Sequence, residues 1–386
     1  MIHEQMRTAV LFTAEVLKQE AGYPIIANRF IRLVIALVAF GAAVVPASAS
    51  VLSDLAAQMQ PGEWRTLTTN GFSQGDILKG NSVSGTILEY TDTAVRNPLT
   101  KKIYIIGCVR EGNYDCGTTG SPSAGWIEYD EATNSWRRMP STAINSAFHG
   151  YNHATINPAT GDFYYWEMGK TAKKYSSGAL TTLPSIDSSI PPEYTGMEFF
   201  PERNGLVLVN TRDGPARIHT YNLGTGSWTS KQIPMPYSIH QIAKYSAKHK
   251  LVYFGGGSNT SDMLFTMDAQ GNVKQVANSP VSIGISSNCP VHVADPISGN
   301  LLVMSPNGRI YEYDPVGNVW TQSGTHPLKG SSDQRAAAVP VPEYGVLMVV
   351  KWDFGSSAVY LYKHSGGSLP PIDTTPPAIP LGTAVQ

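Results

Sequence analysis

Histidine, tyrosine and arginine recur in short polar segments of this chain and are candidates for acid–base chemistry. Histidine exchanges protons near neutral pH, tyrosine can act as an acid, and arginine can neutralise the carboxylate of a uronate. Such a set could cleave an acidic polysaccharide by β-elimination. The candidate catalytic residues are His149, His153, Tyr194, His240 and Arg335.

The same segments carry residues that could bind a ligand without reacting with it. A polar lining with a few aromatic rings is typical of a ligand site, and Tyr151 and Tyr237 could stack on sugar rings. The alternative is that these polar groups bond only to water and backbone. The candidate ligand-binding residues are Tyr151, Asn152, Glu198, Tyr237, Asn288, His292 and Asp333.

The spacing of the histidines does not favour a metal site. His149 and His153 are four residues apart. On a strand this spacing separates them by about 13 Å, which is too far for one ion. Only a bend at Gly150 would bring them together. We therefore predict no cofactor and keep a metal ion as the weaker alternative.

A long repeat determines where these segments come together. Tyr129, Tyr175, Tyr221, Met267 and Tyr313 are each 46 residues from the next, and Tyr362 follows after 49. A period in this range indicates a propeller or a solenoid. The abundant glycine and proline suit many short strands joined by turns.

The units share an apolar strand, a Tyr-Asp or Tyr-Asn strand, a turn and a Trp strand. Tyr129 and Trp136, Tyr221 and Trp228, and Tyr313 and Trp320 are each seven residues apart. The Asp, Asn and Gly residues between them indicate a hairpin turn. At the same spacing, Thr182 and Lys274 take the place of tryptophan in the second and fourth units.

This pattern resembles the kelch repeat over roughly residues 60–366. Val252-Tyr-Phe-Gly-Gly256 is similar to the double-glycine strand end of that family. The resemblance implies an all-β, six-bladed β-propeller around a central channel. The last unit lacks its Trp strand, and the strand around Trp64 could complete it by pairing with the strand that ends at Tyr362. Seven blades, with residues 72–84 contributing, are the alternative.

The resemblance also implies that the candidate segments meet at one mouth of the channel, where the innermost strands begin. The kelch propeller is shared by galactose oxidase, whose copper site needs histidines, tyrosines and a cysteine. Cys289 lies at this level of the repeat, but the sequence lacks the Tyr-His dipeptide of that family. If the protein is an enzyme, a polysaccharide lyase is therefore favoured over a copper-radical oxidase.

The N-terminal region predicts export. Arg29 and Arg32 precede an apolar run from Leu33 to Pro46, and Ala47-Ser48-Ala49 follows. A basic flank, a short apolar core and a small-x-small site are what signal peptidase requires. We expect cleavage after Ala49 and a secreted or periplasmic protein, with an uncleaved membrane anchor as the alternative. Export would permit a disulfide between Cys108 and Cys116, although two free thiols would also fit.

These features divide the chain into an N-terminal extension with a signal peptide (1–49), a propeller (50–366) and a Pro/Thr-rich tail (367–386). The net charge is only −1 and no basic stripe is present, which argues against nucleic acid as a partner. We expect an extracellular carbohydrate or a cell-surface protein as the partner, and no permanent membrane span after signal cleavage. Binding is the leading function, and polysaccharide cleavage is the alternative.

Overall fold

The computed structural model describes residues 49–72, 87–88, 91–108, 124–139, 151–166, 171–186, 195–211, 216–258, 262–285, 290–328, 336–353 and 356–365. The chain forms two compact units, 1–49 and 50–386, and the described residues lie almost entirely in the second unit. The predicted signal segment up to residue 48 and the tail 367–386 lie outside the described residues.

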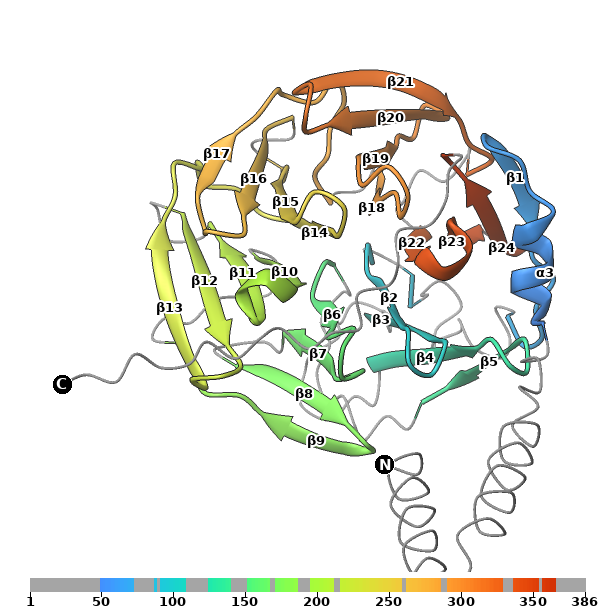
Figure 1. Cartoon of the computed structure of the whole chain (residues 1–386), viewed down its shortest axis with the longest axis horizontal. Helices are drawn as coiled ribbons and strands as arrows, with labels where there is room; N and C mark the ends of the chain where they lie inside the picture. The colour runs from blue at the N-terminus through green and yellow to red at the C-terminus, as the bar shows by residue number, and fades with distance from the viewer. Residues whose placement is uncertain are drawn as a thin grey trace, which may run out of the picture. The chain divides into compact units, whose positions relative to one another are not determined.

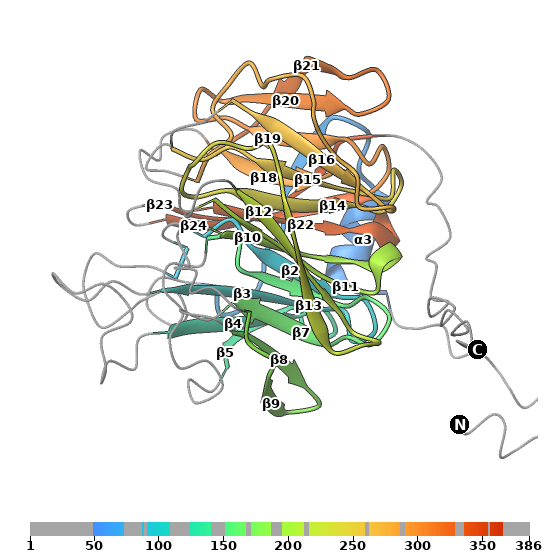
Figure 2. The ribbon, with the colours of Figure 1, turned by 90° about the vertical axis from the view of Figure 1, so that its left-hand side faces the viewer.

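The described strands form six four-stranded antiparallel sheets arranged as blades in a ring (Figure 1). The protein is therefore a six-bladed β-propeller, as predicted, and not the seven-bladed alternative. Figure 2 shows the ring edge-on, with the helix α3 (Val51–Ala57) toward one of its faces. Short 3₁₀ turns, η4 (Pro201–Arg203) and η5 (Pro342–Tyr344), follow two of the innermost strands.

In each blade the chain runs from the innermost to the outermost strand, except that β1 supplies the outermost strand of the last blade. Blade 1 consists of β2 (Ala94–Asn97), β3 (Lys102–Cys108), β4 (Ala124–Asp130) and β5 (Ser135–Arg138). Blade 2 consists of β6 (Ala154–Ile156), β7 (Phe163–Trp166), β8 (Ala172–Ser176) and β9 (Ala179–Thr182). Blade 3 consists of β10 (Thr195–Phe200), β11 (Gly205–Asn210), β12 (Arg217–Asn222) and β13 (Ser227–Gln232). Blade 4 consists of β14 (Ile242–Ser246), β15 (Leu251–Gly255), β16 (Leu264–Asp268) and β17 (Val273–Gln275). Blade 5 consists of β18 (Val291–Ala294), β19 (Leu301–Met304), β20 (Arg309–Asp314) and β21 (Val319–Thr325). Blade 6 consists of β22 (Ala336–Val341), β23 (Val346–Asp353), β24 (Ser356–Lys363) and β1 (Glu63–Thr66).

The ring closes by pairing the two ends of the propeller, as the sequence predicts. In β1, Trp64 lies opposite Tyr362 of β24, and the two rings stack with their centroids 4.3 Å apart. The blue strand β1 lies beside the red strand β24 in Figure 1. This pairing covers an edge of β24 that would otherwise expose unpaired backbone groups.

Three of the repeated tryptophans join their blade to the one before it. The indole Nε1 of Trp228 donates to the carbonyl of Pro184 at 2.8 Å, and that of Trp320 donates to Ala277 at 2.8 Å. Trp64 donates in the same way to Thr325 at 3.1 Å. The acceptor in each case lies in, or just after, the outermost strand of the preceding blade. The repeat therefore specifies contacts between blades as well as the hairpins within them.

Two positions expected from the spacing are corrected by the structure. Leu180, not Thr182, lies opposite Tyr175, and Val273, not Lys274, lies opposite Met267. The turns in these two blades are shorter, which shifts the pairing. In blade 2 the turn consists of two residues with positive φ, Ser177 and Gly178, as a tight hairpin requires.

The hydrophobic core is divided among the gaps between blades. Each of the six clusters of buried apolar side chains within the described residues joins two neighbouring blades. Tyr129, Tyr313 and Tyr362 of the repeat are almost completely buried in these clusters. Because every blade depends on both of its neighbours for burial, the ring is one cooperative unit and the innermost strands are held close together around its axis.

Candidate functional site

The six innermost strands surround the axis, and each contacts the next all the way around the ring. Each of them begins at the same face, because all six sheets are traversed from the inside outward. We call this face the mouth, and we call the polar interior between the innermost strands the hub. The candidate segments predicted from the sequence lie just before or within these strands.

A buried ion cluster crosses the hub. The Nζ of Lys244 in blade 4 lies 3.2 Å from Oδ2 of Asp92 and donates to the backbone carbonyl of Asp92 at 2.5 Å. The Nδ1 of His292 in blade 5 lies 3.0 Å from the same Oδ2. Asp92 precedes the first strand of blade 1, which is opposite blade 4 in the ring. Three distant segments of the chain therefore meet at one carboxylate.

The electrostatics of this cluster favour an ionised Asp92. Burial raises the pKa of the Asp92 carboxyl, but the positive charge of Lys244 and the contacts with His292 outweigh it, so the pKa lies below its usual range. An ionised carboxylate can only accept hydrogen bonds, and Nδ1 of His292 must therefore carry the proton that it shares with Asp92. The Nε2 of His292 is buried and has no hydrogen-bond partner among the residues that the structure describes.

The innermost strand of blade 6 begins with three small residues. The strand β22 lies between β2 and β18 in the ring, and it begins with Ala336, Ala337 and Ala338. All three are buried. Ala336 and Ala338 pack in the cluster shared with blade 5, and Ala337 packs in the cluster shared with blade 1.

A second carboxylate lies in the hub near Lys244. Glu198 accepts a short hydrogen bond from the hydroxyl of Thr155, and it also accepts the backbone N–H groups of Phe199 at 2.9 Å and Tyr245 at 3.3 Å. Loss of water around the carboxyl raises the pKa of Glu198, and these donors together with Lys244 offset only part of the increase. Glu198 is thus the hub carboxyl that most readily takes up a proton.

Asn152, just before β6 of blade 2, links its segment to three other blades through its side chain and backbone. Its Oδ1 accepts the N–H of Ala243 at 2.7 Å, its Nδ2 donates to Thr93 at 3.3 Å, and its carbonyl accepts the N–H of Met197 at 2.8 Å. Asn152 is almost completely buried. The contacts of Asn152, Glu198 and His292 are those of groups that hold the hub together, and their predicted role in ligand binding stays a prediction.

At the mouth, three candidate residues form one aromatic group. The ring of Tyr151 stacks on His240 with centroids 4.9 Å apart and 22° between the planes. His153 meets the same tyrosine edge-on at 5.2 Å. Tyr151 and His153 are buried, whereas His240 is half-buried. The structure thus brings together two of the predicted catalytic residues around one of the predicted binding residues.

The backbone at this group is held in an uncommon conformation. Tyr151 has φ +34° and His240 has φ +66°, values that residues other than glycine rarely adopt. The carbonyl of Tyr151 accepts the N–H of Asp92 and the hydroxyl of Thr93, both at 2.9 Å. Neighbouring segments therefore hold the strained backbone in place, which is common at functional sites.

Tyr237 lies three residues before His240 and is 46% exposed. Among the large apolar side chains that are exposed in the described part of the chain, it is the one aromatic ring. The adjoining loop after β15 packs closely, because a Cβ on Gly257 would lie 2.2 Å from the hydroxyl of Ser238. The segment that carries Tyr237 therefore packs against the loop that follows β15 of blade 4.

Several candidates cannot be compared with the structure. His149, Tyr194, Asn288, Asp333, Arg335 and Cys116 lie outside the described residues. Cys108 ends β3, but its side chain is also outside them. Within the described residues, no group of three His, Cys, Asp or Glu side chains could hold a metal ion.

The sequence reasoning missed Asp92 and Lys244, the two charged partners at the hub. Lys244 occupies the position in blade 4 that Glu198 occupies in blade 3, so alignment of the repeats would have singled it out. Asp92 precedes an innermost strand like the other candidates. Its contacts with blades 4 and 5 have no signal in the sequence.

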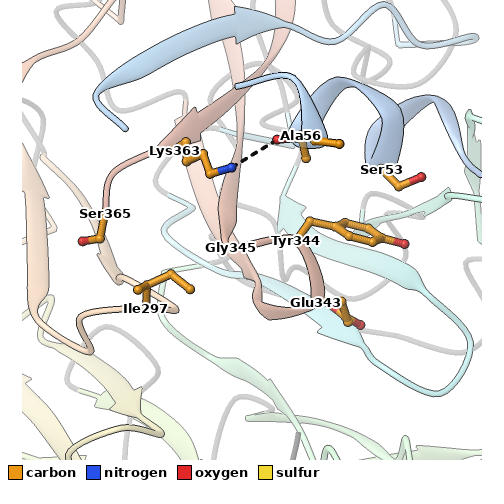
Figure 3. Close-up of a pocket in the computed structure, with 9 residues that line it drawn as sticks. Ser53, Ala56, Ile297, Glu343, Tyr344, Gly345, Lys363 and Ser365 are labelled. Atoms are coloured by element: carbon orange, nitrogen blue, oxygen red, sulfur yellow. Dashed lines mark hydrogen bonds between the residues drawn. The ribbon is translucent and has the colours of Figure 1, made fainter. Parts of the chain in front are cut away.

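The opposite face carries a pocket of about 370 Å³ between α3, η5 and the end of β24 (Figure 3). It lies beyond the far ends of the innermost strands, and none of the predicted site residues lines it.

No helix among the residues that the structure describes is long and apolar enough to cross a bilayer. No protein-family model and no curated protein matches the chain.

Proposed function

We propose that this propeller is a secreted binding protein that recognises an extracellular saccharide, or another cell-surface partner, at the mouth of its channel. A propeller provides a rigid scaffold for such a site or for an enzyme, and its fold alone does not decide between them. The observation that carries the proposal is the stacked pair of Tyr151 and His240 at the mouth, with the exposed ring of Tyr237 three residues before His240 in the chain.

The chemistry of this group suits a sugar ring. An exposed aromatic face buries the apolar C–H face of a sugar, while nearby polar groups bond to its hydroxyls. The cluster of Asp92, Lys244 and His292 crosses the hub below. We therefore expect the ligand to rest on the mouth.

Tyr237→Ala tests the proposal directly. We expect retention on a panel of immobilised neutral and acidic polysaccharides to weaken about tenfold, which is ~1.4 kcal/mol of binding free energy. The melting temperature should not change, because the side chain is exposed. Tyr237→Phe should bind like the unmodified protein if stacking is the main contribution.

Leu99→Ala is the matched control, since Leu99 is also exposed but lies in the turn after β2, at the opposite face. Equal binding by the Tyr237→Ala and unmodified proteins to every polysaccharide that is retained would overturn the mouth as the site. Retention of none of them would instead direct the search to a protein partner at the cell surface.

One observation favours the alternative, a polysaccharide lyase that acts by β-elimination. His153 and His240 both contact the ring of Tyr151, so two groups able to exchange protons lie at one place near the mouth. The test is the ultraviolet absorbance of unsaturated products from uronate polymers. His240→Asn should abolish it while tolerating the positive φ of this position, since asparagine adopts that conformation readily.

A further inference from the structure

The first helix of the propeller is part of its core. In α3, Leu52 and Ala56 are 0% and 1% exposed and pack in the cluster that joins blades 1 and 6. Lys363, at the end of β24, donates to the carbonyl of Ala56 at 3.4 Å, as drawn in Figure 3. The helix therefore helps to hold the junction at which the ring closes.

This helix begins with its own complete set of capping contacts at Ser50. The hydroxyl of Ser50 accepts the N–H of Ser53 at 3.0 Å, and the N–H of Ser50 donates to the hydroxyl of Ser53 at 2.8 Å. These reciprocal bonds form a capping box, which satisfies donors that a helix start leaves free. No residue before Ser50 is needed to begin the helix.

Ser50 also contacts a buried carboxylate of the propeller. Its hydroxyl donates to Oε1 of Glu131 at 2.7 Å. Glu131 further accepts the hydroxyl of Tyr344 at 2.6 Å and pairs with Arg96 at 2.7 Å. Burial raises the pKa of the Glu131 carboxyl, but the hydrogen bonds from Tyr344 and Ser50 and the charge of Arg96 lower it by more. The pKa therefore lies below its usual range, and the carboxylate stays ionised.

The chain changes character immediately before this residue. The boundary between its two compact units falls between Ala49 and Ser50. Ala49 itself is exposed. The boundary directly follows Ala47-Ser48-Ala49, which has the small-x-small form that signal peptidase recognises.

We propose that the Ala49–Ser50 peptide bond is a proteolytic processing site and that Ser50 becomes the N-terminus of the mature propeller. Hydrolysis breaks the amide C–N bond: the oxygen of water becomes part of the new Ala49 carboxylate, and both of its protons go to the Ser50 nitrogen, which becomes a charged ammonium group. The amine forms at the residue whose side chain already contacts ionised Glu131, which compensates its positive charge. The capping hydroxyls, α3 and β1 all stay with the propeller.

The test is the intact mass and N-terminal sequence of the full chain after export from a secreting bacterium. We expect a single mature species that begins at Ser50. Ala49→Phe should block the cut, because the residue before the bond must be small. Ser48→Phe is the matched control and should be cut normally, since the middle position of the small-x-small motif is not restricted. None of these substitutions falls within the propeller unit.

A second measurement separates the processing site from the role of the cap. Ser50→Ala in a chain that begins at residue 50 should unfold at a lower urea concentration, because it loses the capping box and the contact with Glu131. An uncut exported chain, or a mature end at any residue other than Ser50, would overturn the proposal, as would normal cleavage of Ala49→Phe. Unchanged stability of Ser50→Ala would overturn Ser50 as the beginning of the fold.

Discussion

Trp64, Trp228 and Trp320 make the same contact in three blades, whereas equivalent positions on the innermost strands make different ones. Thr155, Glu198 and Lys244 occupy the same position in blades 2, 3 and 4. On the next strand of the blade they lie opposite Tyr164, Val207 and Tyr253, respectively. Thr155 donates to Glu198. Lys244 instead reaches across the hub to Asp92. The outer part of each blade is thus built by repetition, and the hub is built by divergence.

The difference has a physical basis. A contact between the outer strands of neighbouring blades can recur around the ring, because each blade meets the next in the same geometry. At the axis all six blades face one small volume, which six identical charged side chains could not share. Differences among the innermost strands are therefore required for burial, and they are also where a specific function can arise.

The largest expected effect tests the hub. Asp92→Asn should lower the free energy of unfolding by about 3–5 kcal/mol, because it leaves Lys244 buried without its counter-charge. Asp92→Asn combined with Lys244→Met should cost less than the sum of the two single changes, since the double variant buries no unpaired charge. Urea unfolding measures both quantities.

Asp130→Asn is the matched control, because Asp130 pairs with Lys102 at 3.3 Å in a partly exposed position. Its cost should not exceed about 1 kcal/mol. Strictly additive costs for Asp92 and Lys244 would show that the hub cluster does not act as a unit.

The repeated frame should behave in the opposite way. Trp228→Phe and Trp320→Phe should each cost about 1–2 kcal/mol, because each loses a hydrogen bond to the preceding blade and part of a half-buried ring. The two sites are in different blades and share no partner, so their costs should add to within about 0.5 kcal/mol. Strong coupling between them would remove the distinction between frame and hub.

The pH dependence of stability should separate the two hub carboxyls. The lowered pKa of Asp92 means that its contribution is complete above its ordinary value of 3.8 and is lost as the pH falls through the folded-state pKa. The raised pKa of Glu198 has the opposite sign, and stability should fall as the pH rises above its ordinary value of 4.5. Glu198→Gln should abolish the second trend and leave the first in place. The measurement is the urea midpoint of unfolding across this pH range. If Glu198→Gln changed only the loss of stability at low pH, the raised pKa would not belong to Glu198.

The smallest expected effect lies in the degenerate hairpin of blade 2. Ser177 has φ +49° and precedes Gly178 in a two-residue turn. Ser177→Asn creates the Asn-Gly pair that such turns favour, and it should stabilise the protein by roughly 0.5 kcal/mol. Thermal unfolding of the Ser177→Asn protein measures this effect. Ser176→Asn, which changes the last residue of β8, is the control. A stabilisation from both variants would point to a cause other than the turn.

Much of the frame could be predicted from the sequence, because it depends on local signals. The spacing of Tyr and Trp indicated the outer hairpins, and the missing last strand indicated that Trp64 would pair near Tyr362. The prediction was wrong only where a shortened turn shifted the register, at Leu180 and Val273. Turn length changes pairing by whole residues, and spacing alone does not reveal it.

The mouth and the hub could be predicted only in part. The sequence put Tyr151, His153 and His240 at one level of the repeat, and in the structure the rings of His153 and His240 both contact Tyr151. The same level also suggested His292, which instead pairs with buried Asp92. Whether a polar side chain faces a ligand or a buried partner depends on which blades stand opposite each other, and that is a property of the closed ring.

The sequence by itself thus determined the period, the number of blades and the strand that closes them, because hairpins and hydrophobic patterns are encoded within a few tens of residues. Only the tertiary structure decided that Asp92, Lys244 and His292 share one buried cluster, and that Ser50 begins the fold against Glu131. These contacts join segments from 81 to 200 residues apart. No local pattern records them, since they exist only once the ring has closed.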